Sequence, residues 1–139
     1  MRYMWDTNIC IYLIQQQPRE LIAHCEALTY GDAVLSSIVL AELRHGAERN
    51  PANRAQAQMA LSAMLGLLPV VSFDEAAATA YSVVCAAVPD RKRDALDRLI
   101  AAHAISLKLI LVTNKETDFA GYPGLQLENW IKTPGNLAA

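Results

Sequence analysis

The sequence predicts an α/β protein, a three-layer sandwich in which helices cover a mostly parallel sheet of four or five strands. Short apolar runs alternate with longer stretches that carry apolar residues at helical spacing, as happens when helices join parallel strands. Hydrophobic residues make up 53% of the chain and aromatic residues only 6%, so the core is aliphatic and suits helices packed on a sheet. With 139 residues, the chain is long enough for one such domain.

The N-terminal region predicts one strand followed by two helices. Tyr3–Trp5 is a short apolar run, and the apolar stretch Ile9–Ile14 behind it predicts a helix. Pro18 ends this helix, because proline lacks the backbone N–H that a helix interior needs. Arg19–Tyr30 then carries a second helical stripe, which stops at Gly31.

The middle of the chain repeats the pattern of a strand followed by a capped helix. Ala33–Leu35 predicts a buried strand, and the hydroxyls of Ser36–Ser37 can cap a helix that runs through Ala47. Pro51 is expected to open the next helix, at an early position where its missing N–H costs nothing, and Pro69 is expected to end it.

The next segment predicts a strand and two helices with a loop between the helices. Val70–Phe73 is β-branched enough for a strand, and Asp74 can cap the alanine-rich helix Glu75–Val88. Pro89–Arg93 belongs to the most polar patch of the chain and predicts a loop. After it, the apolar residues of Leu96–Leu107 fall on one helical face.

The C-terminal part predicts the remaining strands. Leu109–Val112 is a continuous apolar run, as a buried parallel strand would be. Tyr122–Gly124 predicts a turn, and Leu125–Trp130 predicts a last edge strand. We expect residues 1–132 to form a single domain and residues 133–139 to form a flexible tail.

Charge and composition exclude several classes of protein. The formal charge is −2, so the chain lacks the basic footprint of a protein that coats nucleic acid, and any nucleic-acid binding must be local. No apolar run reaches the about 18 residues that cross a bilayer, and no signal segment is visible, so we expect a cytoplasmic protein without membrane contact. Cys10, Cys25 and Cys85 lack metal-binding spacing and are expected to be buried free thiols.

Four acidic residues from distant parts of the chain are candidates for one site. Parallel sheets place ligands in the crevice beyond the carboxyl ends of their strands. Asp6 directly follows the first predicted strand, and Asp118 lies a few residues after the strand that ends at Val112. Glu42 and Asp97 lie early in helices whose N-terminal ends face the same rim. Glu42 also stands between apolar neighbours, so its carboxylate needs a partner or a metal.

A divalent metal is the physical reason to assemble such a cluster, because carboxylates without a cation repel one another and raise their pKa values. Mg²⁺ fits, since it prefers oxygen ligands and keeps several waters, one of which can act as a nucleophile. Each acid also has another explanation. Asp6 could be only a helix N-cap, Asp97 a surface residue with Asp94 as its rival, and Asp118 and Glu116 ordinary loop acids.

Four motifs follow one another at wide spacing along the chain. They are Tyr3–Asn8, then Ser36–Leu43 with Gly46, then Asp97–Ala104, and finally Leu111–Asn114 with Asp118 and Phe119. In this order they resemble the motifs of PIN-domain proteins, most closely the VapC toxins, and the ending from Pro123 to Trp130 is similar as well. The resemblance covers nearly the whole chain, and four ordered motifs are a strong signal where one alone would be weak.

The resemblance implies an Mg²⁺-dependent endoribonuclease, with Mn²⁺ able to substitute, that cleaves a structured RNA such as tRNA. It implies that Asp6, Glu42 and Asp97 form an acidic triad, of which we expect Asp6 and Asp97 to be the direct metal ligands. It also implies a homodimer and a cognate antitoxin protein that blocks the site. The chain would then be the toxin of a toxin–antitoxin module.

The resemblance further implies a fourth acid, for which we choose Asp118. Many family members carry an acid or Asn directly after Asn114, where this chain has Lys115. Asn114 and Glu116 are therefore rivals for the fourth position.

Several other polar residues could support the site. Thr7 and Asn8 could hydrogen-bond the metal waters or the scissile phosphate, although helix capping explains them equally well. His103 is expected to be a core histidine, and Trp5 and Trp130 to be packing residues. A group of basic residues could hold phosphates around the acids, or could form an ordinary solvated face. They are Arg44, Arg91, Lys92, Arg93 and Arg98.

Two alternative functions stay open at this point. An aspartate-nucleophile phosphotransferase or phosphatase also places an Asp after its first strand, and Thr113 and Lys115 superficially suit it. The second acid that such enzymes carry two residues after the nucleophile is absent, because Asn8 stands there. A non-catalytic partner-binding domain could instead use the same carboxylates to bind arginines.

Overall fold

The computed structural model describes residues 1–88 and 95–131, and within them it confirms the predicted α/β architecture. All strands of this part form one parallel sheet in the order β3-β2-β1-β4-β5. The strands are β1 Tyr3–Trp5, β2 Ala33–Ser36, β3 Val70–Val71, β4 Ile110–Val112 and β5 Gln126–Glu128. The expected loop Pro89–Arg93 and the expected tail 133–139 lie outside the described residues.

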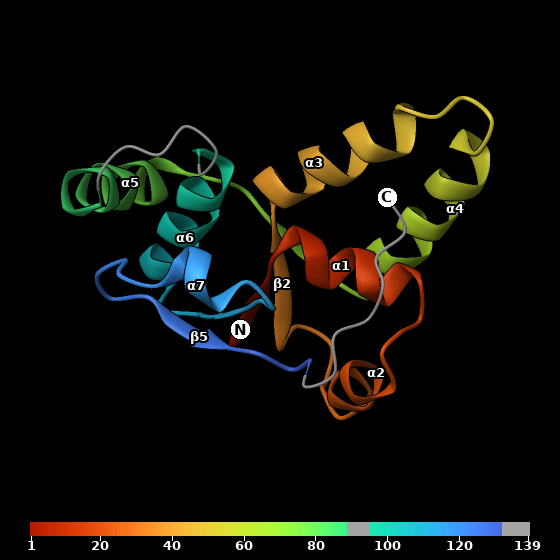
Figure 1. Ribbon diagram of the computed structural model, residues 1–139, viewed down its shortest axis with the longest axis horizontal. Coiled ribbons are helices and arrows are strands. Elements are labelled where there is room, and N and C mark those ends of the chain that lie inside the picture. Colours follow the sequence, from red (N-terminus) through yellow and green to blue (C-terminus); the bar gives the residue numbers. More distant parts are fainter. Residues whose placement is uncertain (89–94, 132–139) are drawn as a thin grey trace.

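The helices lie to both sides of the sheet. Figure 1 shows α5 and α6 to one side of β2, and α1, α3 and α4 to the other. Helix α5 packs on α6, and α3 packs on α4. In the described ranges no helix is long and apolar enough to span a bilayer. The helices of these ranges are α1 Thr7–Ile14, α2 Arg19–Glu26, α3 Ser37–Glu48, α4 Arg54–Leu65, α5 Glu75–Ala87, α6 Ala95–Leu107 and α7 Glu116–Phe119.

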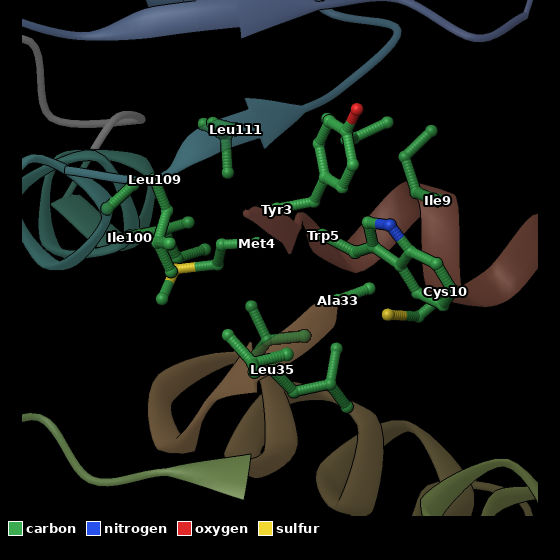
Figure 2. Packing of buried hydrophobic residues seen from close by; sticks show 14 of the residues in the cluster. Tyr3, Met4, Trp5, Ile9, Cys10, Ala33, Leu35, Ile100, Leu109 and Leu111 are labelled. Carbon is green, nitrogen blue, oxygen red and sulfur yellow. The ribbon is translucent and has the colours of Figure 1, made fainter. Parts of the chain in front are cut away.

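Strand β1 lies at the centre of the sheet and is buried on both faces. Figure 2 shows Met4 pointing toward Ile100 of α6, while Tyr3 and Trp5 point to the opposite face, toward α1. All three side chains of the strand are buried. Because successive side chains of a strand alternate between faces, a strand covered on both sides consists of apolar residues throughout.

The sheet has its topological switch point at β1. From β1 the chain moves outward through β2 to β3, and then returns to the other side of β1 to add β4 and β5. The connections that leave β1 and β4 therefore diverge, and open parallel sheets bind their ligands in the crevice formed at such a point. Asp6 and Thr113 are the first residues after these two strands.

Helix α2 is shorter than predicted, since it ends at Glu26 rather than at Tyr30. The carboxylate of Asp32 accepts a hydrogen bond from the Thr29 N–H at 3.0 Å, and the Asp32 N–H donates back to the Thr29 carbonyl. An aspartate acceptor of this kind closes a turn in competition with the helix. The apolar stripe in the sequence therefore overstated the length of the helix.

The prediction that Pro51 opens helix α4 was wrong, because the helix begins at Arg54. The side chain of Asn50 accepts a hydrogen bond from the Ala52 N–H at 3.2 Å, and the Asn53 N–H donates to the Asn50 carbonyl at 3.1 Å. These two bonds close a turn around the proline, as asparagine side chains often do.

Strand β3 has two residues where four were predicted. The N–H of Phe73 donates to the Ser37 hydroxyl at 3.0 Å instead of joining the strand ladder. A side chain of the neighbouring helix thus ends the strand.

Most side chains that the sequence assigned to the core are there. His103 is buried, with its Nδ1 2.8 Å from the Ser36 hydroxyl oxygen, and Trp5 packs edge-on against Trp130. The cysteines are free thiols as predicted, but burial was correct for only the first of Cys10, Cys25 and Cys85, since the other two are half-buried.

Candidate active site

Asp6 stands where β1 ends and α1 begins, and it is both a helix cap and a buried acid. Its Oδ1 accepts the Ile9 N–H at 2.9 Å, which caps α1. Its Oδ2 accepts the hydroxyl of Thr113. The residue is only 1% exposed. This burial raises the pKa of Asp6 from 3.8 to about 6, against the lowering effect of the two hydrogen bonds.

Thr113 links the ends of the two central strands. Trp5 and Val112 are register partners in β1 and β4, and the Asp6 N–H continues the ladder by donating to the Val112 carbonyl at 3.1 Å. Thr113 is fully buried, and its hydroxyl oxygen also accepts the Lys115 N–H at 2.9 Å. The hydroxyl therefore fixes the Asp6 carboxylate on one side and the start of the following segment on the other.

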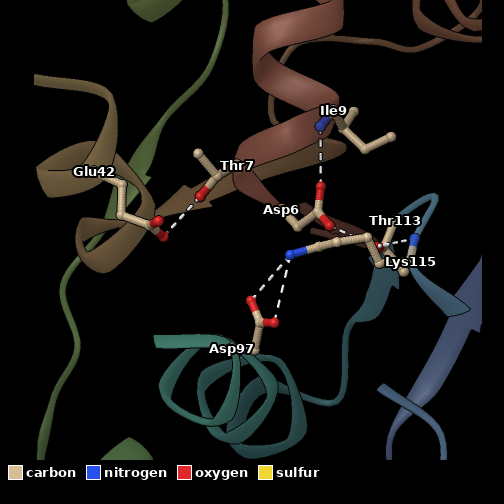
Figure 3. A network of polar contacts seen from close by, with 7 residues as sticks. All are labelled: Asp6, Thr7, Ile9, Glu42, Asp97, Thr113 and Lys115. Atoms are coloured by element: carbon tan, nitrogen blue, oxygen red, sulfur yellow. Dashed lines mark hydrogen bonds and ion pairs between the residues drawn. The ribbon is translucent and has the colours of Figure 1, made fainter. Parts of the chain in front are cut away.

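Asp97 lies in the first turn of α6 and pairs with Lys115. The ammonium nitrogen of Lys115 is 3.3 Å from Oδ1 and 3.4 Å from Oδ2 of Asp97. Figure 3 shows this ammonium group between the carboxylates of Asp97 and Asp6. Burial disfavours the charge on Lys115, but the negative charges of Asp97, Asp6 and Asp118 outweigh it, so the pKa of Lys115 is raised.

Glu42 of α3 has a polar partner, as its apolar sequence neighbours required. The Thr7 hydroxyl donates to Oε1 of Glu42 at 2.8 Å. Thr7 directly follows Asp6 and is the first residue of α1, so this bond ties the two helices together beside the buried acid (Figure 3).

The pair of Asp6 and Asp97 fits a hard divalent cation. The charge of Asp97 acts on Asp6 and raises its pKa, whereas the charge of Lys115 lowers it. The carboxylates of Asp6 and Asp97 therefore face one position, which the positively charged ammonium group of Lys115 occupies. Mg²⁺ typically uses one or two carboxylates and keeps its remaining waters. Across residues 1–88 and 95–131 there is no close group of three or more His, Cys, Asp and Glu side chains, so the four candidate acids do not converge into one cluster.

The candidates for the fourth position differ in their surroundings. Asp118 and Glu116 are exposed on α7, and Asp118 acts on Lys115 only through its charge. Asn114 is half-buried, and its amide donates to the Tyr12 hydroxyl at 3.4 Å. Its Oδ1 is buried without a hydrogen-bond partner among the described residues. Of the three, Asn114 alone presents a buried side-chain oxygen.

The structure describes only two of the five basic residues that were expected to hold phosphates around the acids. Arg44 is exposed on α3. Arg98 is not on a rim, because it is 6% exposed and its Nη1 lies 3.6 Å from the Cys85 sulfur. Asn8 is half-buried in the first turn of α1. The other three candidates lie outside the described residues: Arg91, Lys92 and Arg93.

Sequence reasoning missed two partners in this site. The sequence analysis placed Thr113 in a family motif, noted Lys115 as a departure from it and saw both as features of a phosphotransferase, but it gave neither an acidic partner. The structure joins Thr113 to Asp6 and Lys115 to Asp97. Their position directly after the apolar run 109–112 was the available signal, because that run predicts a strand beside the one that precedes Asp6.

A groove of about 840 Å³ lies apart from these acids. It runs along α1, α2 and the end of α4, and both Leu67 and Tyr30 are largely exposed on it. Most of its lining is apolar, including Leu13, Ile14, Ile22, Met64, Leu67 and Leu68.

Comparison with known proteins assigns the chain to a protein family. The PIN-domain family model matches residues 3–125, and the chain is 38% identical to Ribonuclease VapC2 of Rickettsia felis over 136 residues, which cover 95% of this chain and all of the relative. The chain belongs to the VapC ribonucleases of the PIN-domain family. A second relative of this PIN-domain ribonuclease is the tRNA(fMet)-specific endonuclease VapC of Shigella flexneri, which is 33% identical and is covered over 98% of its length, with 94% of this chain.

Solved structures confirm the PIN fold. The ribonuclease superposes on VapBC2 from Rickettsia felis, bound to a promoter DNA fragment, with a TM-score of 0.82 and 34% identity over 94% of this chain and 99% of that chain. It superposes on DNA-bound VapBC from Salmonella typhimurium with a TM-score of 0.83 and 30% identity, over 94% and 98% of the two chains. This PIN-domain ribonuclease is thus the toxin type of a toxin–antitoxin system, as the sequence predicted, and nothing favours the phosphotransferase alternative.

Proposed function

We propose that this protein is a metal-dependent endoribonuclease in which Asp6 and Asp97 bind Mg²⁺, and that Mn²⁺ can replace it. The observation that carries the proposal is the position of these two carboxylates around the ammonium group of Lys115, at the switch point of the sheet. Bound there, Mg²⁺ would lower the pKa of a coordinated water and stabilise negative charge on the phosphate.

The surrounding residues hold the two carboxylates for this task. Asp6 is fixed by its bonds from Ile9 and Thr113, and each of its oxygens keeps a further lone pair for a cation. Asp97 is carried by the first turn of a long helix. Fixed ligands lose little freedom when an ion binds, so a preorganised pair supports binding.

We assign Glu42 a role in handling the attacking water. One of its oxygens is bonded to Thr7, the residue that follows Asp6, and Glu42 is half-buried. The second oxygen can accept a proton from water. Asp118 remains our proposed fourth acid, with Asn114 and Glu116 as rivals and Asn8 as a supporting residue.

The proposed substrate is a structured RNA, and tRNA is the first candidate because relatives from Shigella flexneri and Salmonella typhimurium are named tRNA(fMet)-specific endonucleases. The chain carries a net charge of −2, so its phosphate contacts must be local. Arg44, which is exposed on the same helix as Glu42, suits such a contact.

The proposed partners are a cognate antitoxin and a second copy of this chain, in the cytoplasm. Similar proteins have been crystallised as VapBC assemblies. The apolar groove offers a surface for an antitoxin helix, since an amphipathic helix binds by laying its apolar face into such a groove. The oligomeric state is tested by light scattering of the purified toxin with and without its antitoxin.

The nuclease proposal is tested by incubating purified protein with total RNA, with Mg²⁺, with Mn²⁺ or with a chelator, and mapping new RNA ends. Cleavage should require a metal. Asp6→Asn should lower cleavage by more than about 100-fold, because changes in outer-shell partners alone cost about 10- to 100-fold. Circular dichroism checks that the variant is folded. Metal-independent cleavage, or full activity of a folded Asp6→Asn protein, would refute the proposal.

A further inference from the structure

Lys115 is a cation that the chain itself brings into the acidic site. Its ammonium nitrogen contacts both oxygens of Asp97, at 3.3 and 3.4 Å. On the other side, its charge acts on the buried carboxylate of Asp6. The ring of Phe119 lies 5.7 Å away, within the range of a cation–π contact. The ammonium therefore sits where negative charge from several elements meets (Figure 3).

The backbone of Lys115 is held in place, while its side chain reaches the solvent. The Lys115 N–H donates to the Thr113 hydroxyl, which in turn donates to Asp6. The side chain is 31% exposed, so a path to solvent is open. A lysine ammonium is a compact charge on a flexible four-carbon stem. It can rotate outward without any change in the backbone that positions Asp6.

We infer that Lys115 is a built-in competitor of the divalent cation, whose ammonium occupies the space between Asp6 and Asp97 until the ion displaces it. The inference rests on the proposed metal site. The physical reason is that the oxygens bonded to Nζ are also the ones that would coordinate the ion. Binding must therefore break two charge-assisted contacts before new ones form. Metal affinity is accordingly lower than the carboxylates alone would give.

A purely structural lysine makes the opposite prediction. If Lys115 only braced α6 against the segment after β4, the ion would bind away from the ammonium, and removing the lysine would leave metal affinity unchanged or weaken it through the loosened Asp97. If Lys115 competes, removing it frees Asp97 and strengthens metal binding. The sign of the change separates the two roles.

The test is isothermal titration of Mn²⁺ into the metal-free wild-type protein, Lys115→Met and Lys108→Met. Lys108 is an exposed lysine before the amino end of β4, whereas Lys115 follows the carboxyl end of the same strand, and it serves as the matched control. Lys115→Met should bind Mn²⁺ about tenfold or more tightly than wild type, which corresponds to the loss of one charge-assisted contact, and Lys108→Met should match wild type. Lys115→Met should also melt at a lower temperature than wild type without metal and gain more from Mn²⁺.

Each outcome decides between the proposals. Equal or weaker Mn²⁺ binding by folded Lys115→Met overturns the competitor role and leaves the metal site standing. If neither the wild-type protein nor Lys115→Met binds Mn²⁺, the proposed metal site is wrong and the inference falls with it. Binding by Lys115→Met alone supports both. Lys115→Gln, which keeps a polar end group, provides the same comparison if the methionine variant does not fold.

Discussion

The hydroxyl of Thr113 is bonded to the carboxylate of Asp6, although the two residues are 107 positions apart in the chain. Each follows the last residue of a central strand, so the bond joins two adjacent strand ends. It stabilises the ionised form of an acid whose burial favours the neutral form. Thr113 therefore favours the anionic form of Asp6, together with the Ile9 N–H and the charge of Lys115.

Thr113→Val should raise the pKa of Asp6 above its value of about 6 in the metal-free protein, because the substitution removes a donor to the charged form and keeps the volume. A carbon-13 NMR titration of the Asp6 carboxyl measures this shift. The variant should also lose about 1–3 kcal/mol of stability. Thr117→Val, on the exposed face of α7, is the matched control and should change neither quantity. An unchanged Asp6 titration in Thr113→Val would contradict the assigned role.

Asp6 should make the metal-free protein less stable as the pH rises from about 4 to about 6. Because its pKa is raised in the fold, the folded state binds this proton more tightly than the unfolded chain does. The contribution is therefore fully present below about pH 4 and is lost above about pH 6, and the shift corresponds to about 3 kcal/mol. Urea unfolding of wild type and Asp6→Asn across this pH range, with a chelator present, measures the contribution of Asp6 to the free energy of unfolding. A stability difference that stays constant across the window would contradict the prediction.

Asp97→Asn should abolish Mn²⁺ binding and RNA cleavage, because it removes one of two ligand charges. Asp94→Asn, which changes the rival acid three positions earlier in the sequence, should leave both close to their wild-type values. Calorimetry and an RNA cleavage assay measure the two effects. If Asp94→Asn is the damaging change, the third motif has been aligned with the wrong acid.

Leu67→Asp should weaken antitoxin binding and leave RNA cleavage by the free toxin unchanged, because Leu67 lines the apolar groove and lies apart from the acids. Met59→Asp is the matched control. It changes a residue that is equally exposed, at 73%, but does not line the groove. Surface plasmon resonance with the cognate antitoxin compares the variants. Equal affinities would exclude the groove as the binding surface.

The sequence was sufficient for the sheet and for the acid at its centre. The apolar runs around Met4, Val34 and Leu111 became the three central strands because each is buried from both sides, and such strands consist of apolar residues throughout. Asp6 was predicted from its position directly after the first of these runs. Its second role as a helix cap uses the same carboxylate, so the two readings of the residue were not exclusive.

The contacts that the sequence did not reveal depend on competing local bonds or on distant partners. Pro51 opened no helix because the Asn50 side chain closed a turn first. The pairing of Lys115 with Asp97 depends on how β4 and α6 approach each other, and no periodicity within either segment carries that information. Arg98 lies one position beyond Asp97, yet it is turned inward.

The switch point also determines when the candidate site can assemble during folding. Asp6 and its partner Thr113 are 107 positions apart in the chain. Contacts between such distant segments form late, since the intervening chain must be ordered first. A chain in which β1 has not yet paired with β4 has its first acid, but neither the strand nor the hydroxyl that holds it. The candidate site therefore assembles only after the long-range pairing of β1 with β4.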